Sequence, residues 1–402
     1  MKNKILYTCS GPADLIRTYN HWLQNETDPN EVSITFSGQI LDYCSLNNSD
    51  LYMISTHSKK DLQQHENNIT IEHRKKPNFN FLGSFGYHLG EFVYCIGLLR
   101  TALSFRANII LADSGVTHYF MLFLFRCFGI KVICVLHNTL WPSGFPPKRT
   151  IPRIILWLDK FFFKFGANAI LGVSDECSIQ IKHLAGNKLL DDKIFQFRAQ
   201  FNKPFFNQIP PAPEFTNKPF TIMFIGRIEE FKGVHDILQI AEVLNTKYPN
   251  QFQWIICGTG PDLIKLKESA RTKNLMDFVD IKGWISLEEL VDVYTISHMA
   301  IVPTTNGFKE GLAMTAAEAI LAGRPIITSP VVPAMNEMKS ACYEAVTNNI
   351  DSYVHGIEKI VSDKELYEKM RLSCSIEGEQ FLDRQKGLTA ILGLAVKYCL
   401  KN

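Results

Sequence analysis

The sequence of 402 residues lacks several patterns that mark whole classes of protein. Its ten cysteines form no Cys-x-x-Cys pair, which argues against zinc and disulfide frameworks and predicts buried thiols in a reducing compartment. No stretch of about 18 residues is both apolar and free of charge, because Arg126 and Lys131 interrupt the longest apolar run. The first apolar run is too short for a signal peptide. We therefore expect a cytoplasmic protein, either free or on the inner face of a membrane.

Strong charge bias, internal repeats and low-complexity tracts are also missing. The net charge of +2 is too small to indicate nucleic-acid binding. No Asp-x-Asp motif occurs, and we expect no obligatory metal. Hydrophobic residues make up 46% of the chain, which supports full cores, and the length suits two domains.

Strand-like apolar runs alternate with helical or mixed segments through the first half of the chain. This alternation predicts a parallel sheet with helices on both faces. The expected strands are Ile5–Cys9, Val32–Phe36, Leu51–Ser55, Ala107–Ala112, Lys131–Leu136 and Asn168–Val173.

Five prolines between Asn202 and Pro219 predict a linker, and a second series of strands and helices follows it. We expect an N-terminal domain at 1–203, the linker at 204–219, a C-terminal domain at 220–384 and a final helix at 385–402.

Two carboxylates, Glu310 and Glu318, bracket seven residues between strand-like runs. Their loop should lie at the carboxyl end of a strand, where open α/β sheets bind ligands. Thr315 followed by Glu318 matches a capping box and predicts a short helix over 316–322, whose first N–H groups favour an anion. An exposed loop carboxylate would also explain Glu310, and a pure helix cap would explain Glu318.

A basic loop lies between a buried strand and an amphipathic helix in the same half. It carries Arg227 and Lys232, which suit a diphosphate as a bidentate fork and a point charge. The alternative is a solvated loop that Glu229 and Glu230 neutralise.

At these motifs the chain resembles family 4 glycosyltransferases (glycosyl transferases group 1). These are retaining enzymes of the GT-B architecture, in which two Rossmann-like, doubly wound α/β domains face a central cleft. The resemblance is clear over the C-terminal half and looser over the N-terminal half, where it depends on His137 and Val173-Ser174. The C-terminal motifs are Gly226-Arg-x(4)-Lys-Gly233, Cys257-Gly-Thr-Gly-Pro261, Ile281-Lys-Gly-Trp284, Glu310-x(7)-Glu318 and Ala322-Gly-Arg-Pro325.

The resemblance implies roles for residues of this chain. Arg227 and Lys232 would bind the donor diphosphate, Glu310 the donor sugar and Glu318 the ribose hydroxyls. Backbone groups after Glu310 would hold the phosphate or sugar, and backbone near Ile281 would meet the base. The family usually has an aromatic-Gly step where this chain has Leu312-Ala313. The predicted nucleotide-sugar residues are Gly11, Gly226, Arg227, Lys232, Ile281, Glu310, Gly311, Leu312, Ala313, Met314, Thr315 and Glu318.

His137 ends a buried strand and should face the cleft. The family often has a His here that contacts the donor sugar, so the predicted catalytic set is His137, Glu310, Arg227 and Lys232. A structural His bonded to loop backbone is the alternative. Gly11 matches the family's Gly-rich turn near the diphosphate, but Pro12 removes one N–H donor.

Residues 147–165 carry five cations against Asp159 and interleave them with aromatic residues. Such a helix can lie on an anionic bilayer, and the acceptor would then be a lipid-linked saccharide. A helix packed on the N-terminal sheet with lysines at its rim is the alternative.

These features predict a retaining, metal-independent glycosyltransferase that uses a nucleotide-diphosphate sugar. Its acceptor would be a saccharide or lipid-linked saccharide in bacterial surface polysaccharide synthesis (capsule, O-antigen or lipopolysaccharide). A nucleotide-sugar 2-epimerase and a non-catalytic sugar-nucleotide-binding protein remain alternatives. Acceptor specificity should lie in the loops at 37–50, 57–85 and 141–153.

Overall fold

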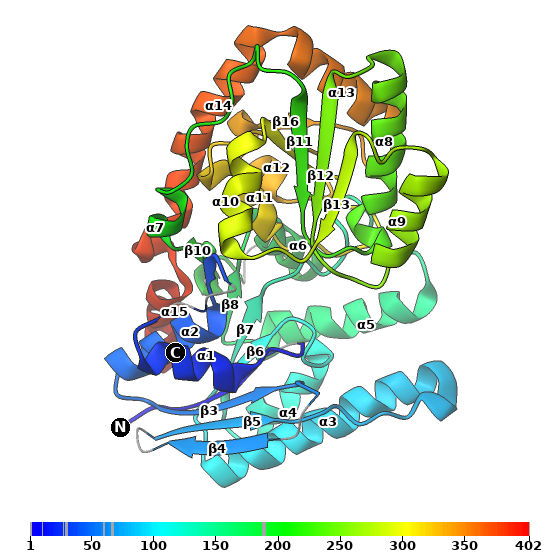
Figure 1. Ribbon diagram of the computed structural model, residues 1–402. Helices are drawn as coiled ribbons and strands as arrows, with labels where there is room; N and C mark the ends of the chain where they lie inside the picture. The colour runs from blue at the N-terminus through cyan, green and yellow to red at the C-terminus, as the bar shows by residue number, and fades with distance from the viewer. Residues whose placement is uncertain are drawn as a thin grey trace.

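The computed structural model describes residues 2–9, 11–26, 28, 31–58, 61–65, 68–186 and 190–401. Several residues of the predicted segments lie outside this part of the chain. They include Met1 at the start of the N-terminal domain, Asn402 at the end of the final helix, and Ser10 in the turn after the first strand. Two large sheets form, one in each half, and the strands β11, β12 and β13 of the second large sheet point toward the N-terminal half (Figure 1).

The N-terminal sheet has eight strands in the order β4-β5-β3-β1-β6-β7-β8-β9. All neighbours are parallel except β4 and β5, which form an antiparallel edge that we did not predict. The strands are β1 Lys4–Thr8, β3 Asp50–Ser55, β4 Asp61–His65, β5 Ile69–His73, β6 Ile109–Asp113, β7 Lys131–Leu136, β8 Ala169–Gly172 and β9 Ile194–Gln196. The longer helices of this half are α1 Leu15–Leu23, α2 Phe36–Leu46, α3 Gly83–Phe105, α4 Phe123–Cys127, α5 Thr150–Phe161 and α6 Asp175–Ala185.

The strand predicted at Val32–Phe36 is wrong. Only Ser33–Ile34 is extended, as β2, and it pairs antiparallel with β10 (Gln200–Phe201) in a separate two-stranded sheet. The reason is local, because the Thr35 hydroxyl accepts a hydrogen bond from the N–H of Gly38 at 3.1 Å and caps α2.

The C-terminal sheet has six parallel strands in the order β13-β12-β11-β14-β15-β16. They are β11 Phe220–Ile225, β12 Phe252–Cys257, β13 Val279–Gly283, β14 Met299–Val302, β15 Ile326–Thr328 and β16 Cys342–Glu344. Helices cover both faces, as expected for a doubly wound sheet (Figure 1). They are α8 Val234–Lys247, α9 Leu263–Thr272, α10 Leu287–Ile296, α11 Met314–Leu321, α12 Ala334–Glu337, α13 Ile350–Ser362 and α14 Lys364–Gly378.

The last helix, α15 (Leu388–Lys401), lies on the N-terminal half beside α2 (Figure 1). The N–H of Leu388 donates to Gln39 Oε1 at 2.8 Å, and the Thr389 hydroxyl donates to the carbonyl of Gln39 at 2.9 Å. The proline-rich linker, which contains α7 (Lys203–Phe206), is tied to the C-terminal half, because buried Arg324 donates to the carbonyl of Pro210 at 2.9 Å.

Short helices complete the chain: η1 Asn80–Leu82, η2 Tyr119–Leu122, η3 Phe162–Gly166, η4 Asp191–Lys193, η5 Glu230–Lys232, η6 Lys339–Ala341, η7 Glu379–Phe381 and η8 Arg384–Lys386. No disulfide joins the ten cysteines, all of which lie in the described part of the chain, and all but Cys127 are buried. No helix in the described part of the chain is long and apolar enough to cross a membrane.

Candidate active site

The loop after β11 lies directly against the loop after β14. Gly233 has a φ of 73°, and a Cβ at this position would lie 2.2 Å from the carbonyl oxygen of Pro303. The N–H of Thr305 also donates to the carbonyl of Phe231 at 2.9 Å. Glycine alone fits so close an approach. The loop therefore brings Lys232 to the carboxyl end of β14.

Lys232 and Glu310 form a buried ion pair at this place. Lys232 Nζ lies 2.5 Å from Glu310 Oε2, and the two side chains are 16% and 8% exposed. The hydroxyl of Thr304 donates to the same carboxylate oxygen at 3.2 Å. The alternative that Glu310 is an exposed loop carboxylate is therefore wrong. Because burial strengthens electrostatic attraction, the pair holds two predicted site residues together.

Arg227, by contrast, remains at the surface. Its side chain is 57% exposed, and Nη1 lies 3.0 Å from Glu229 Oε1, the ion pair that the neutralised-loop alternative expects, whereas Lys232 pairs with Glu310. The diphosphate-binding role of Arg227 stays a prediction. The ring of Phe308 lies 5.4 Å from Arg227 Cζ and 4.1 Å from Lys232 Nζ. Cation–π attraction therefore draws both cations to one ring. We predicted no role for Phe308, although it stands two residues before Glu310.

Helix α11 starts earlier than predicted and has no side-chain cap. It runs over Met314–Leu321 rather than 316–322, and Ala313 is its N-cap, with φ 72° and ψ 91°. Thr315 therefore lies inside the helix, and the capping box with Glu318 is wrong. Ala313 turns the chain into the helix from a region that non-glycine residues seldom adopt. The first N–H groups of the helix have no partner within it and can donate to an anion.

Glu318 projects from the middle of α11 and is partly buried. Burial raises the pKa of its carboxyl to about 7, and the nearby charge of Glu31 from the N-terminal half adds to the rise. A carboxyl perturbed in this way between two domains is a candidate functional group. Its contact with a ribose stays a prediction.

His137 follows β7 and is bonded to a carboxylate rather than to loop backbone. Its Nε2 lies 3.1 Å from Asp113 Oδ1, and the Tyr7 hydroxyl donates to Asp113 Oδ2 at 2.8 Å. The ring of Phe36 stacks on the imidazole with centroids 4.2 Å apart. Nδ1 is buried and has no hydrogen-bond partner among the described residues. We did not predict Asp113, although it directly follows an expected strand.

The two halves touch where His137 meets the Glu310 loop. A Cβ on Gly311 would lie 1.8 Å from the carbonyl oxygen of His137, so the two backbones are in contact. The Thr139 hydroxyl donates to the carbonyl of Glu310 at 3.1 Å. Leu312, the next residue, is buried. The structure therefore brings His137, Lys232 and the start of α11 around one point between the sheets.

Three predicted residues lie farther along the sheet ends. Gly11, with φ 85°, accepts from the N–H of Thr56 at 3.1 Å in the turn after β1. Gly226 packs against Gly258, where a Cβ would lie 1.7 Å from the Gly226 carbonyl. Ile281 lies in β13 with its side chain buried, so only its backbone can face a ligand. Within the described residues no hydrogen bond joins Gly11 or Ile281 to the Lys232–Glu310 pair, and their roles stay predictions.

A cleft of about 1230 Å³ lies between the two halves beside this cluster. Its walls come from α3, α5, the segment 138–147 and the loop 306–309. Aromatic and polar side chains alternate along it: Ser84, Tyr87, His88, Glu91, Ser114, Thr117, His118, Tyr119, Asn138, Thr139, Trp141, Phe145, Asp159, Asn306 and Phe308. Such a mixture suits a saccharide, whose rings have both apolar faces and hydroxyl groups.

The predicted acceptor loops contribute unequally to this cleft. Many residues of the segment 141–153 line the cleft. From the segment 57–85, the described lining includes only Ser84. The segment 37–50 is mostly the helix α2 and is absent from the described cleft lining. Asp159 is a lining residue that we did not predict, and burial raises the pKa of its carboxyl to about 7.

Comparison with known structures defines the class of fold. The chain is similar to sucrose-phosphate synthase from Thermosynechococcus elongatus, with a TM-score of 0.73 and 12% identity over 100% of both chains. It is also similar to Anabaena HepE in complex with UDP, with a TM-score of 0.64 and 12% identity over 100% of this chain and 99% of that one. The protein therefore has the GT-B fold, as the sequence resemblance predicted.

The C-terminal half of the chain also matches a protein family. Residues 205–373 match the family described as glycosyl transferases group 1. An uncharacterized glycosyltransferase of Haemophilus influenzae is 29% identical over 176 residues, which are 42% of this chain and 48% of that protein. The chain thus matches about half the length of that relative.

Proposed function

We propose that the protein is a retaining, metal-independent glycosyltransferase that takes a sugar from a nucleoside-diphosphate donor. The observation that carries this proposal is the cluster of Lys232, Glu310 and the uncapped start of α11, which faces His137 across the domain boundary. It combines a cation, free N–H donors and a hydrogen-bonding carboxylate, which a sugar diphosphate requires. Anabaena HepE, which shares the fold, binds UDP.

The mechanism uses these groups to stabilise the leaving diphosphate. The bond between the anomeric carbon and the diphosphate oxygen breaks, and the acceptor oxygen forms its new bond on the same face of the sugar. The acceptor proton passes to the departing phosphate oxygen. Lys232, Arg227 and the first N–H groups of α11 receive the developing negative charge. Glu310 orients sugar hydroxyls, and the two cations take the place that a metal ion would otherwise fill.

We propose that the acceptor saccharide occupies the cleft beside Phe308, with its lipid-linked form used in bacterial surface polysaccharide synthesis. The lining of this cleft includes Asn138, which follows His137, and Lys309, which precedes Glu310. A hydroxyl of a sugar bound there would lie next to the donor.

Helix α5 supports a membrane-associated location for this acceptor. Asp159 is its only fully buried residue, whereas Ile151, Ile154 and Trp157 are 55%, 52% and 57% exposed. Leu156 packs against the core, and Phe162 and Phe163, just after α5, are buried, so one side of this segment follows the core-packing alternative. Cations along the same segment would attract anionic headgroups. We propose that this face meets the inner surface of a cytoplasmic membrane.

A donor screen tests the transferase proposal. The protein is incubated with each common nucleotide sugar, with and without EDTA, and release of nucleoside diphosphate is followed. We expect slow, EDTA-resistant hydrolysis of one donor that Arg227→Ala and Glu310→Gln abolish and that Arg271→Ala, on the outer helix α9, retains. Release that survives Arg227→Ala and Glu310→Gln would refute the site, and release that needs a divalent cation would refute metal independence.

Sedimentation with anionic vesicles tests the membrane face. We expect binding at low salt that weakens as salt rises, and that Trp157→Glu reduces while Ile264→Glu, 73% exposed on α9, leaves unchanged. Equal binding to neutral vesicles, or no binding at low salt, would refute this part of the proposal.

A further inference from the structure

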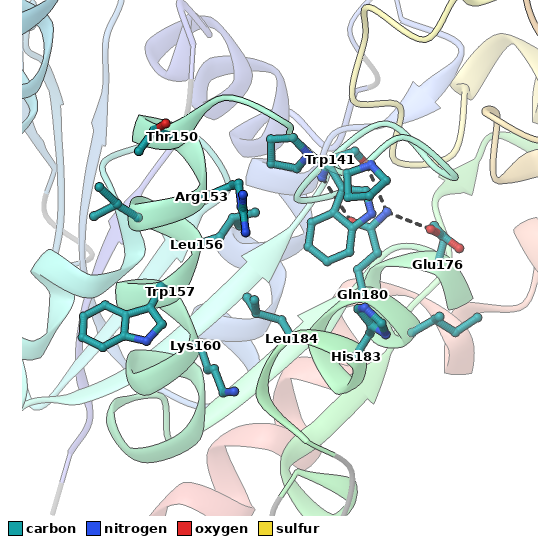
Figure 2. Close-up of a pocket in the computed structure, with 14 residues that line it drawn as sticks. Trp141, Thr150, Arg153, Leu156, Trp157, Lys160, Glu176, Gln180, His183 and Leu184 are labelled. Carbon is teal, nitrogen blue, oxygen red and sulfur yellow. Dashed lines mark hydrogen bonds between the residues drawn. The ribbon is translucent and has the colours of Figure 1, made fainter.

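A second cavity lies between α5 and α6 (Figure 2). Apart from Thr150 and Leu156, the residues of α5 that line it differ from those that line the active-site cleft. The volume of the second cavity is about 770 Å³, which is within the range of about 300–1,000 Å³ usual for small-molecule sites. None of the predicted donor residues lines it. The GT-B active site therefore does not account for this cavity.

The walls of the cavity are mostly apolar, and several of them face water. Trp157 and Ile179 are 57% and 56% exposed, on α5 and α6 respectively. Figure 2 shows Leu156 and Leu184 between the two helices, with the Trp141 ring at one end. Large apolar side chains exposed together usually mark a surface that binds an apolar partner.

Two cations border this apolar surface. Arg153 and Lys160 both line the cavity, and Figure 2 shows Arg153 directed from α5 toward Trp141. The lining carboxylate, Glu176, already accepts a hydrogen bond from Gln180 Nε2 at 2.7 Å. An apolar slot with cations at its edge complements an anionic headgroup attached to a hydrocarbon chain.

The cavity also adjoins the active-site cleft. Trp141, Pro147, Thr150 and Leu156 line both spaces, so α5 is the wall between them and its first turn is the place where they meet. Arg149, which precedes this turn, lines the cleft, and Arg153 lines the cavity. A molecule could therefore place a sugar in the cleft and a chain in the cavity, with its phosphates near these two arginines.

We propose that the cavity between α5 and α6 binds the hydrocarbon chain of a lipid-diphosphate-linked saccharide acceptor. The arginines at the start of α5 contact its phosphates, and Trp141, Leu156, Ile179 and Leu184 contact the chain. The assignment of the occupant as an acceptor rests on the proposed transferase function. Binding of the hydrocarbon chain in the cavity would raise the affinity for the acceptor. This contribution adds to any contact that the rest of α5 makes with a membrane.

The direct test uses farnesyl diphosphate as the probe, below its micelle concentration and without detergent. Binding is followed by calorimetry and by the fluorescence of Trp141 and Trp157, which line the cavity. We expect saturable binding that is stronger than the binding of either inorganic diphosphate or farnesol alone. Saturating UDP should leave it unchanged, since the donor site is separate.

Surface variants locate the bound probe with little risk to folding. Ile179→Glu should weaken binding about tenfold or more because it places a charge against the chain, and Arg153→Glu should weaken the diphosphate compound but not farnesol. Ile264→Glu and Arg271→Glu, both on α9, are the matched controls and should bind normally. Arg227→Ala should also bind normally.

The absence of saturable binding, or binding that Ile179→Glu leaves intact, would overturn the proposal. Loss of binding in Arg227→Ala would place the probe in the donor site and would equally overturn it. Competition by anionic vesicles as strong as by free farnesyl diphosphate would assign the cavity to a bilayer lipid instead of an acceptor. Donor hydrolysis without probe binding would refute only this inference. Cavity-specific probe binding without any donor turnover would refute the transferase function and the role of the occupant as an acceptor, and would leave a binding site for a lipid diphosphate.

Discussion

The two halves of this protein present different kinds of surface to the space between them. In the C-terminal half, short βα loops at the ends of β11 and β14 bring Lys232 onto Glu310 and leave the first N–H groups of α11 free. In the N-terminal half, a cleft of about 1230 Å³ and the exposed face of α5 offer a wide surface on which apolar side chains outnumber charged ones. Under the proposed function, the C-terminal half would bind one small charged group, the donor diphosphate, and the N-terminal half would bind the acceptor over a wide surface.

This difference has a physical basis. A diphosphate is small and highly charged, so a few N–H groups and cations at strand ends suffice to hold it. A saccharide on a lipid spreads its contacts over many weak apolar and polar groups. Substitutions in the two halves should therefore differ in size and kind of effect.

The largest effect should come from breaking the ion pair of the C-terminal half. Lys232→Ala removes the cation that we propose stabilises the leaving group, and we expect turnover to fall about 100- to 1,000-fold. It also strands a buried carboxylate, which should lower the free energy of unfolding by about 3 kcal/mol. Steady-state kinetics and thermal unfolding measure the two effects.

Two further variants separate these effects. Lys232→Ala combined with Glu310→Gln should regain much of the stability but none of the turnover. Lys247→Ala, which removes an exposed lysine paired with Glu358, is the matched control and should change neither. Normal turnover in Lys232→Ala would mean that the C-terminal cluster has no role in the chemistry.

The features that could be predicted from the sequence are the local ones, and they lie mostly in the C-terminal half. The Lys232 loop and the Glu310 loop were predictable because each is a local strand–loop–helix unit with its own motif. Tertiary contacts decided the rest. Phe308 gains its role only when two loops meet, and the cleft walls combine α3 with residues 306–309.

Local errors came from competing short-range signals. Val32–Phe36 has the composition of a strand, yet the cap at Thr35 starts α2 instead. Thr315 has the spacing of a cap from Glu318, yet Ala313 turns the chain into the helix first. In both cases the hydrogen bonding and backbone geometry of one residue outweighed the pattern around it.

A second substitution tests whether the two halves must close on each other. Gly311→Ala would place a Cβ 1.8 Å from the carbonyl oxygen of His137, so closure should fail. We expect turnover to fall about 100-fold from misplacement of the reacting groups, while UDP affinity changes little. Small-angle scattering should show a more open particle. Gly393→Ala is the control, since its Cβ would meet Tyr43 at an ordinary 3.7 Å. Unchanged scattering and turnover would show that closure at this contact is unnecessary.

A third substitution measures the backbone strain at the donor loop. Ala313 has φ 72°, so Ala313→Gly should relieve about 1 kcal/mol and raise the melting temperature by about 2–4 °C. Ala317→Gly, inside α11, should instead destabilise the protein by about 1 kcal/mol. A melting temperature that falls in Ala313→Gly would indicate that the left-handed conformation carries no strain here.

The smallest effect should come from the electrostatic link between the halves. Burial and the charge of Glu31 raise the pKa of Glu318 from 4.5 to about 7, so the carboxylate form is lost as pH falls through about 7. If this carboxylate accepts hydrogen bonds from the ribose, UDP affinity should fall over the same range. Glu31→Gln removes one of the two causes, so its pH midpoint should be lower and its affinity at pH 6 a few-fold higher. Calorimetric titration from pH 5.5 to 8.5 measures this shift. Glu318→Gln should flatten the profile, and Glu268→Gln on α9 should leave it unchanged. An identical midpoint in Glu31→Gln and the wild type would show that the N-terminal half does not tune the donor site.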